Sequence, residues 1–205
     1  LAIPAARVQA AAETYMGLVE TGVGLIPAGG GTKEMLYRYT AAVDFDGQVD
    51  LQPHVNRALE TIGMAKVSTS AYEAAELGFL RDTDAVTMNK DRLLWDAKQA
   101  VLGLAVAGYM PIQPKRLRVV GKPGLAVMKM GIYQLECAGR ISAHDALIAR
   151  RLAYVLAGGE VPAGTRRTEQ DLLDLEREAF LSLCGEPKSQ ARMQHMLMKG
   201  KPLRN

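Results

Sequence analysis

Residues 19–33 read VETGVGLIPAGGGTK, and this stretch decides how the chain is interpreted. It places one carboxylate, Glu20, ahead of a proline and five glycines. Glycine permits positive φ and close backbone approach, and a helix that follows such a turn presents unpaired N–H groups and a positive dipole end. Glu20 is either a solvated loop carboxylate or a group held in a partly apolar pocket, where it could act as a general acid or base. Spacing alone favours the solvated carboxylate.

Two nucleotide-binding patterns fail in this stretch. The phosphate-loop pattern G-x-x-x-x-G-K-[ST] needs a lysine directly after its second glycine and then a hydroxyl, whereas two more glycines follow Gly29 and Thr32 precedes Lys33. The dinucleotide pattern G-x-G-x-x-G needs a glycine where Pro27 stands. We therefore expect no nucleotide at this turn.

The sequence signals differ on the two sides of the turn. Residues 7–10 and 14–19 are short apolar-rich runs without helix caps and are expected to be extended. After Pro27 the patterns predict about six amphipathic helices, whose start and stop signals include Pro53, Ser70, Asn89, Gly108, Ser142, Gly158, Thr168, Gly185, Pro187 and Gly200. The clearest stripe, at spacings of three and four, is Leu94, Ala97, Val101 and Leu104. Residues 111–123 are proline-marked and basic and are expected to form a loop.

Composition sets broad limits on the class of protein. The chain has 205 residues, with 48% hydrophobic and 23% charged residues, which are ordinary globular values. It has no apolar run of about 18 residues and no signal peptide pattern, so we expect no membrane insertion. Two cysteines make no disulfide framework and favour reduced, buried thiols in a cytoplasmic protein. The first residue is Leu1 and not Met, which favours a segment cut from a longer protein.

Charge and histidine spacing bear on two further partners, nucleic acid and metal ions. The net charge is only +3, although residues 188–205 carry five Lys or Arg and no acid, and a second basic cluster comprises Lys115, Arg116, Arg118 and Lys122. A solvated face is the commoner role of such clusters, and contact with phosphates is the alternative. The basic tail lacks interleaved aromatic residues, so we expect no nucleic-acid partner. His54, His144 and His195 lie far apart and show no metal-ligand spacing, so no metal site is expected.

Three stretches resemble the crotonase (enoyl-CoA hydratase) superfamily. Residues 20–32 are similar to the family segment in which a catalytic glutamate precedes a G-x-x-P-G-x-G-G-T type turn into a helix. Residues 65–80, AKVSTSAYEAAELGFL, resemble the later S-A-x-E-A-x-x-x-G-L-V helix and turn. Residues 175–205 look like the C-terminal helices of the family.

One branch of the superfamily is more similar than the others. Residues 15–20, 141–145 and 201–205 resemble bacterial β-oxidation proteins that fuse an N-terminal 3-hydroxyacyl-CoA dehydrogenase to a C-terminal enoyl-CoA hydratase-like domain. The resemblance covers essentially all 205 residues. It implies a mainly α fold with a short β portion, in which residues 1–80 are the C-terminal part of a crotonase-like (ββα) core and residues 81–205 are a helical C-terminal region of the same domain. The dehydrogenase and the first half of the hydratase domain would lie outside this chain.

The resemblance also implies a chemistry, the addition of water to trans-2-enoyl-CoA. In the family two glutamates hold one water and two backbone N–H groups bind the thioester oxygen as enolate charge develops. Glu20 matches the second glutamate, while the first would fall immediately before Leu1, and the oxyanion segments also lie upstream. The turn would fix the direction of Glu20 through Gly22, Gly24, Pro27, Gly29 and Gly30. We therefore expect the isolated chain to be inactive.

The resemblance suggests ligands as well. The substrate is an acyl-CoA, and Lys199, Lys201 and Arg204 are candidate neighbours of the CoA phosphates. NAD would bind in the absent dehydrogenase portion, so this chain is expected to bind no cofactor of its own. A homo-oligomer is expected. The alternative function is a non-catalytic helical domain that mediates interaction or oligomerisation.

Overall fold

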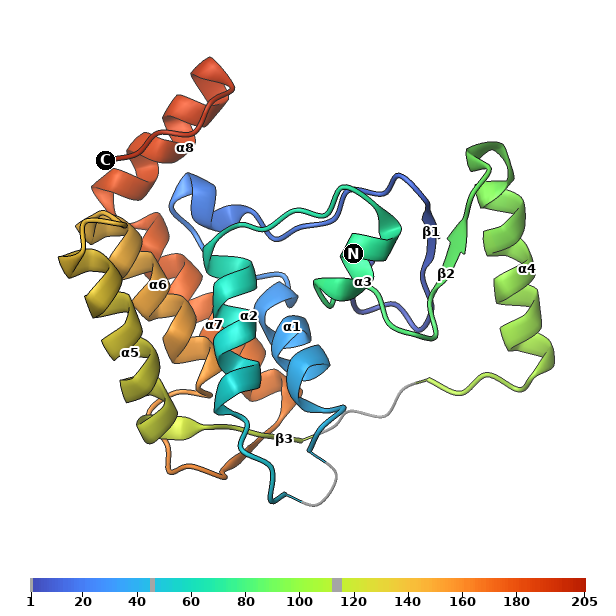
Figure 1. Ribbon diagram of the computed structural model, residues 1–205, viewed down its shortest axis with the longest axis horizontal. Helices are drawn as coiled ribbons and strands as arrows, with labels where there is room; N and C mark the ends of the chain where they lie inside the picture. The colour runs from blue at the N-terminus through green and yellow to red at the C-terminus, as the bar shows by residue number, and fades with distance from the viewer. Residues whose placement is uncertain (1, 45–46, 112–115) are drawn as a thin grey trace. The chain divides into compact units, whose positions relative to one another are not determined.

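The computed structural model describes residues 2–44, 47–111 and 116–205, and these form two compact units (Figure 1). One unit comprises residues 2–17 and 67–111, and the other comprises residues 18–66 and 116–205. The described part of the chain is mainly helical with a few short strands, as the sequence patterns predicted. The predicted division after residue 80 stays a prediction.

The first unit is built on a short parallel pair of strands. β1 (Gln9–Ala11) pairs with β2 (Ala85–Thr87) in the register Ala10 to Val86. The other elements of this unit are α3 (Ala71–Glu76), the 3-10 turn η2 (Lys90–Arg92) and α4 (Leu93–Val106). The predicted extended run at residues 14–19 is reduced to a single bridge between Gly17 and Val67, so that prediction was too long. β2 was missed because three residues carry too little periodicity to be seen.

The core of the first unit is small, and its longest helix does not contribute a buried residue. The buried apolar side chains are Ala10, Ala71, Ala74, Phe79 and Leu80. Asn89 caps η2 directly before α4, because its side chain accepts a hydrogen bond from the Asp91 N–H. The helix predicted between Asn89 and Gly108 is confirmed as α4, although Asn89 caps η2 and not α4 itself. Its apolar stripe is not buried: Leu94 is 83% exposed and Val101 is 64% exposed.

The second unit is a packed group of helices. Its elements are the 3-10 turn η1 (Glu20–Val23), α1 (Gly31–Thr40), α2 (Gln52–Gly63), β3 (Leu117–Arg118), α5 (Gly121–Cys137), α6 (Ala143–Leu156), β4 (Arg166–Arg167), α7 (Glu169–Cys184) and α8 (Pro187–Lys199). α6 lies at the centre and packs against α1, α2, α5 and α7 (Figure 1). The buried side chains at these contacts include Met35, Leu36, Val55, Ile62, Leu152, Leu156, Leu172 and Leu183.

Local signals account for most helix ends in this unit. Ser142 and Thr168 form capping boxes with Asp145 and Asp171, in which each side chain satisfies a free N–H of the first turn. Gly200 ends α8 in the left-handed conformation, as predicted. The predicted loop at residues 111–123 was wrong in part, because β3 pairs with β4 and α5 already begins at Gly121. Residues 112–115 of that prediction lie outside the described residues.

The cysteines bear on one smaller expectation. Both Cys137 and Cys184 are free thiols. The expectation that they are buried was wrong, because Cys137 is exposed and Cys184 is only half-buried. Over the described ranges, no helix combines the length and the apolar character needed to cross a bilayer.

Candidate active site

Glu20 is the first residue of η1, a turn that its own backbone helps to close. The sequence placed Glu20 in a loop, but Glu20 opens a 3-10 turn, and its carbonyl also accepts a hydrogen bond from the Leu25 N–H at 3.0 Å just past the end of that turn. Gly24 ends this turn with φ of 86°, a conformation that glycine adopts at little cost. The backbone around Glu20 is therefore fixed locally.

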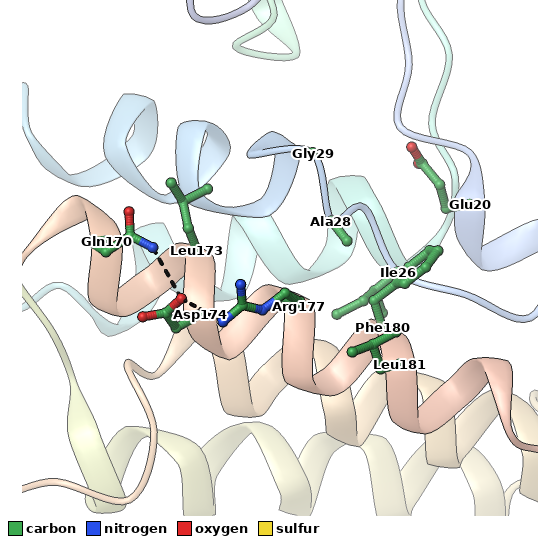
Figure 2. Close-up of a pocket in the computed structure, with 10 residues that line it drawn as sticks. All are labelled: Glu20, Ile26, Ala28, Gly29, Gln170, Leu173, Asp174, Arg177, Phe180 and Leu181. Carbon is green, nitrogen blue, oxygen red and sulfur yellow. Dashed lines mark hydrogen bonds and ion pairs between the residues drawn. The ribbon is translucent and has the colours of Figure 1, made fainter.

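Glu20 lines a pocket in which the other two charged side chains, Asp174 and Arg177, form an ion pair with each other. A cavity of about 600 Å³ is lined by Glu20, Ile26, Ala28, Gly29, Gln170, Leu173, Asp174, Arg177, Phe180 and Leu181 (Figure 2). Gln170 and Arg177 both donate hydrogen bonds to Asp174 along α7, with Arg177 Nη2 3.1 Å from Asp174 Oδ1. Of the two carboxylates in this lining, Asp174 is paired with Arg177, whereas Glu20 forms no ion pair with a described residue.

One oxygen of Glu20 is buried without a partner. Among the described residues, Oε2 of Glu20 is the buried side-chain oxygen or nitrogen that lacks a hydrogen bond. Burying an unsatisfied polar group costs about 1–3 kcal/mol, so such atoms are rare and call for an explanation. A carboxylate oxygen that is held in place, is shielded from solvent and is free to accept a hydrogen bond can bind and activate a water molecule.

Glu176, which was not predicted as a site residue, bonds to the backbone of the glycine turn. The Glu176 side chain is fully buried, and its carboxylate accepts hydrogen bonds from the Gly30 N–H, at 2.9 Å, and the Lys33 N–H. These N–H groups belong to the start of α1, where the helix has free donors and a positive dipole end. Burial raises the pKa of Glu176 to about 7, although both N–H groups lower it. No sequence signal marked Glu176, because its partner lies 146 residues away.

The environment of Lys33 agrees with the rejection of a phosphate loop. Its side chain is 7% exposed, and its ammonium group is bonded to Glu34 and Glu169. Burial acts to lower the pKa of Lys33, but the two carboxylates outweigh it and the net shift is upward. A lysine already neutralised by two carboxylates is a poor phosphate ligand.

The residues proposed to position Glu20 differ in how strictly the structure requires them. A Cβ on Gly24 would lie 2.8 Å from Ser189 Cα, and Gly30 has φ of 89°, so a side chain at either position is excluded or strained. Pro27 accepts a hydrogen bond from the Thr32 hydroxyl at 2.9 Å. Gly22 and Gly29 have open space around the Cβ position. Gly31 was not predicted as a positioning residue, yet a Cβ there would meet Leu18 and Pro27 at 2.9 Å.

The candidate CoA-binding residues lie elsewhere in the second unit. Lys199 ends α8, and Lys201 and Arg204 follow it in the C-terminal tail, all three exposed. They do not line the pocket at Glu20. Their contact with CoA stays a prediction. Across the described ranges, no three His, Cys, Asp or Glu side chains are grouped in a way that could hold a metal ion.

The fold and the site together define a mainly helical chain that presents an unpartnered carboxylate beside a glycine-rich helix start. No protein-family model matches the chain. It is similar to a protein of Bacillus subtilis (strain 168) named "Probable 3-hydroxyacyl-CoA dehydrogenase", with 53% identity over 203 residues. The match covers 99% of this chain but 25% of that relative, so the chain spans about a quarter of the relative's length.

Proposed function

We propose that this chain is part of a longer enzyme of fatty-acid β-oxidation with 3-hydroxyacyl-CoA dehydrogenase activity, and that it supplies the C-terminal part of an enoyl-CoA hydratase-like, crotonase-like domain. The name of the B. subtilis relative supports the first half of the proposal. The resemblance of residues 20–32 to the hydratase turn supports the second half. The observation that carries the proposal is the buried, unpartnered Oε2 of Glu20 at a pocket.

The proposed reaction adds water across the double bond of a trans-2-enoyl-CoA. Glu20 accepts a hydrogen bond from the water through Oε2 and takes its proton as the water oxygen bonds to C3 of the acyl chain. The protonated Glu20 then returns this proton to C2, so that one water has added across the double bond, Glu20 is again a carboxylate and the product is a 3-hydroxyacyl-CoA. This product is the substrate class in the name of the relative, so the two activities would act in succession.

Parts of this machinery would lie outside the 205 residues. The second glutamate and the oxyanion N–H groups that the resemblance implies are not in this chain, and NAD would bind in the dehydrogenase portion. Lys199, Lys201 and Arg204 are exposed cations that could neutralise CoA phosphates. A cytoplasmic location and a homo-oligomeric state belong to the same proposal.

The test is Glu20→Gln in the full-length protein. Gln keeps the size of the side chain but cannot take a proton, so hydratase kcat with crotonyl-CoA should fall by orders of magnitude while dehydrogenase activity persists. Glu13→Gln is the matched control, because Glu13 is an exposed carboxylate of the other unit. The isolated 205-residue chain should show no turnover, and detectable hydration by it would contradict the proposed division of the site.

One observation favours the alternative, a helical interaction domain. α4 buries none of its residues and exposes apolar ones, including Val106 at 91% and Leu102 at 48%. Exposed apolar surface of this kind marks interaction sites. Loss of partner binding or assembly with intact hydratase activity after substitutions in α4 would show that both roles coexist. If Glu20→Gln keeps normal hydratase activity, the catalytic role fails and only the interaction role remains.

A further inference from the structure

α8, which is distant in sequence, contacts the turn that begins at Glu20. The Ser189 hydroxyl donates a hydrogen bond to the Gly24 carbonyl at 2.6 Å, across 165 residues. Gly24 is the residue that ends the turn, and its own N–H bonds back to Thr21. A Cβ on Gly24 would lie 2.8 Å from Ser189 Cα, so the two backbones are in direct contact. α8 therefore packs on the turn itself.

The hydroxyl of Ser189 is oriented by a second buried group. His144 Nε2 lies 3.0 Å from Ser189 Oγ, and both residues are buried, at 4% and 0% exposure. Ser189 has one proton and gives it to Gly24, so its oxygen must accept from His144. This assigns the Nε2–H form to His144 and also rules out a nucleophilic role for Ser189, because His144 has no free Nε2 lone pair to remove the hydroxyl proton.

The pair is anchored in turn by an ion pair between α6 and α8. Arg192 is 2% exposed and bonds Asp145 at 2.7 Å, while its Nε bonds the Asn205 side chain at 2.9 Å. Asp145 is the capping residue next to His144. The contact between α8 and the Glu20 turn thus includes three buried polar residues, His144, Ser189 and Arg192, and each has a hydrogen-bond partner, which favours one geometry.

We infer that Ser189, oriented by His144, is a positioning residue for Glu20: it holds the Gly24 carbonyl and so fixes the turn from which Glu20 reaches its pocket. The inference rests on the proposed role of Glu20. Neither Ser189 nor His144 lines that pocket, so neither acts on the substrate. Their effect passes through the backbone of residues 20–24.

The test compares two serine variants in the full-length protein. Ser189→Ala removes the donor to Gly24, and Ser182→Ala is the matched control, since the Ser182 hydroxyl bonds the Ala179 carbonyl within its own helix. Hydratase kcat per folded enzyme should fall roughly 10- to 100-fold in Ser189→Ala with little change in KM, because displacing a catalytic group by about 1 Å can cost on the order of 100-fold. Ser182→Ala should keep the wild-type kcat. Equal kcat in the two variants would overturn the inference.

A second pair keeps the test decisive if Ser189→Ala folds poorly. His144→Gln retains an N–H donor near the position of Nε2, whereas His144→Leu removes it. We expect the Leu variant to lose several-fold more kcat than the Gln variant, as a hydrogen bond of ordinary strength corresponds to a factor of roughly 2–10. Equal losses would indicate a role in packing alone and would contradict the inference.

The variant Glu20→Gln separates the two possible failures. If Glu20→Gln abolishes hydration but Ser189→Ala behaves as Ser182→Ala does, only the positioning role fails. If Glu20→Gln retains hydratase activity, the proposed function fails and the positioning role falls with it.

Discussion

At the scale of single residues, Glu20 and Glu176 show how burial gives two carboxylates different tasks. Glu20 keeps one oxygen unpaired at a pocket, while Glu176 has both oxygens bonded to N–H groups at the start of α1. A pattern of glycines directed attention to Glu20. Glu176 sits in a helix rich in Glu and Asp, and only the fold distinguishes it from the exposed carboxylates around it.

The buried state of Glu176 predicts a pH dependence of stability. Burial raises its pKa from 4.5 to about 7, so the folded chain binds the proton more tightly than the unfolded chain. The resulting stabilisation is complete below pH 4.5 and is lost as the pH rises to about 7, a change on the order of 3 kcal/mol. In urea unfolding at several pH values, Glu176→Gln should abolish this decline. Glu178→Gln, an exposed neighbour on α7, should retain it, and an unchanged decline in Glu176→Gln would refute the assignment.

At the scale of elements, the ends of the helices were predicted far better than the contacts that the helices make with distant parts of the chain. Ser142 and Thr168 cap helices through contacts three residues away, so the sequence contains both partners. The bridge from Ser189 to Gly24 joins residues 165 apart, and no local pattern encodes it. β3 and β4 were missed for a related reason, since each has two residues and exists only through pairing with the other.

The ion pair between α6 and α8 predicts a large stability difference between two similar substitutions. Asp145→Asn leaves the Arg192 charge buried without its carboxylate, which we expect to cost about 3 kcal/mol. Asp174→Asn breaks the Arg177–Asp174 pair, whose side chains are 70% and 50% exposed, and should cost at most about 1 kcal/mol. Chemical denaturation of both variants measures the difference. Similar losses would mean that the Arg192 pair does not anchor α8.

At the scale of the whole molecule, the chain leaves a large apolar surface on α4. The spacing of Leu94, Ala97, Val101 and Leu104 correctly predicted a helix, but periodicity cannot say what covers its apolar side. The chain spans a quarter of the relative's length, and the crotonase-like core and the homo-oligomer both stay proposals.

The exposed face of α4 predicts association of the isolated chain. Leu94 and Val101 are 83% and 64% exposed, and we expect the purified 205-residue chain to self-associate through them. Leu94→Lys with Val101→Lys should shift the population toward monomer in sedimentation velocity. Lysine in place of Leu181, which is 61% exposed on α7, provides the control and should not shift it. The same degree of association in all three proteins would place the contact elsewhere.

If Glu20 is an acid–base group of enoyl-CoA hydration, the ratio of two hydratase rates must show it. Hydratase kcat is measured at saturating crotonyl-CoA for the full-length wild-type protein and for Glu20→Gln. We expect kcat of Glu20→Gln to be lower by roughly 100- to 10,000-fold, the range typical of a lost general acid or base. A kcat within about threefold of wild type, less than 1 kcal/mol in activation free energy, would contradict it.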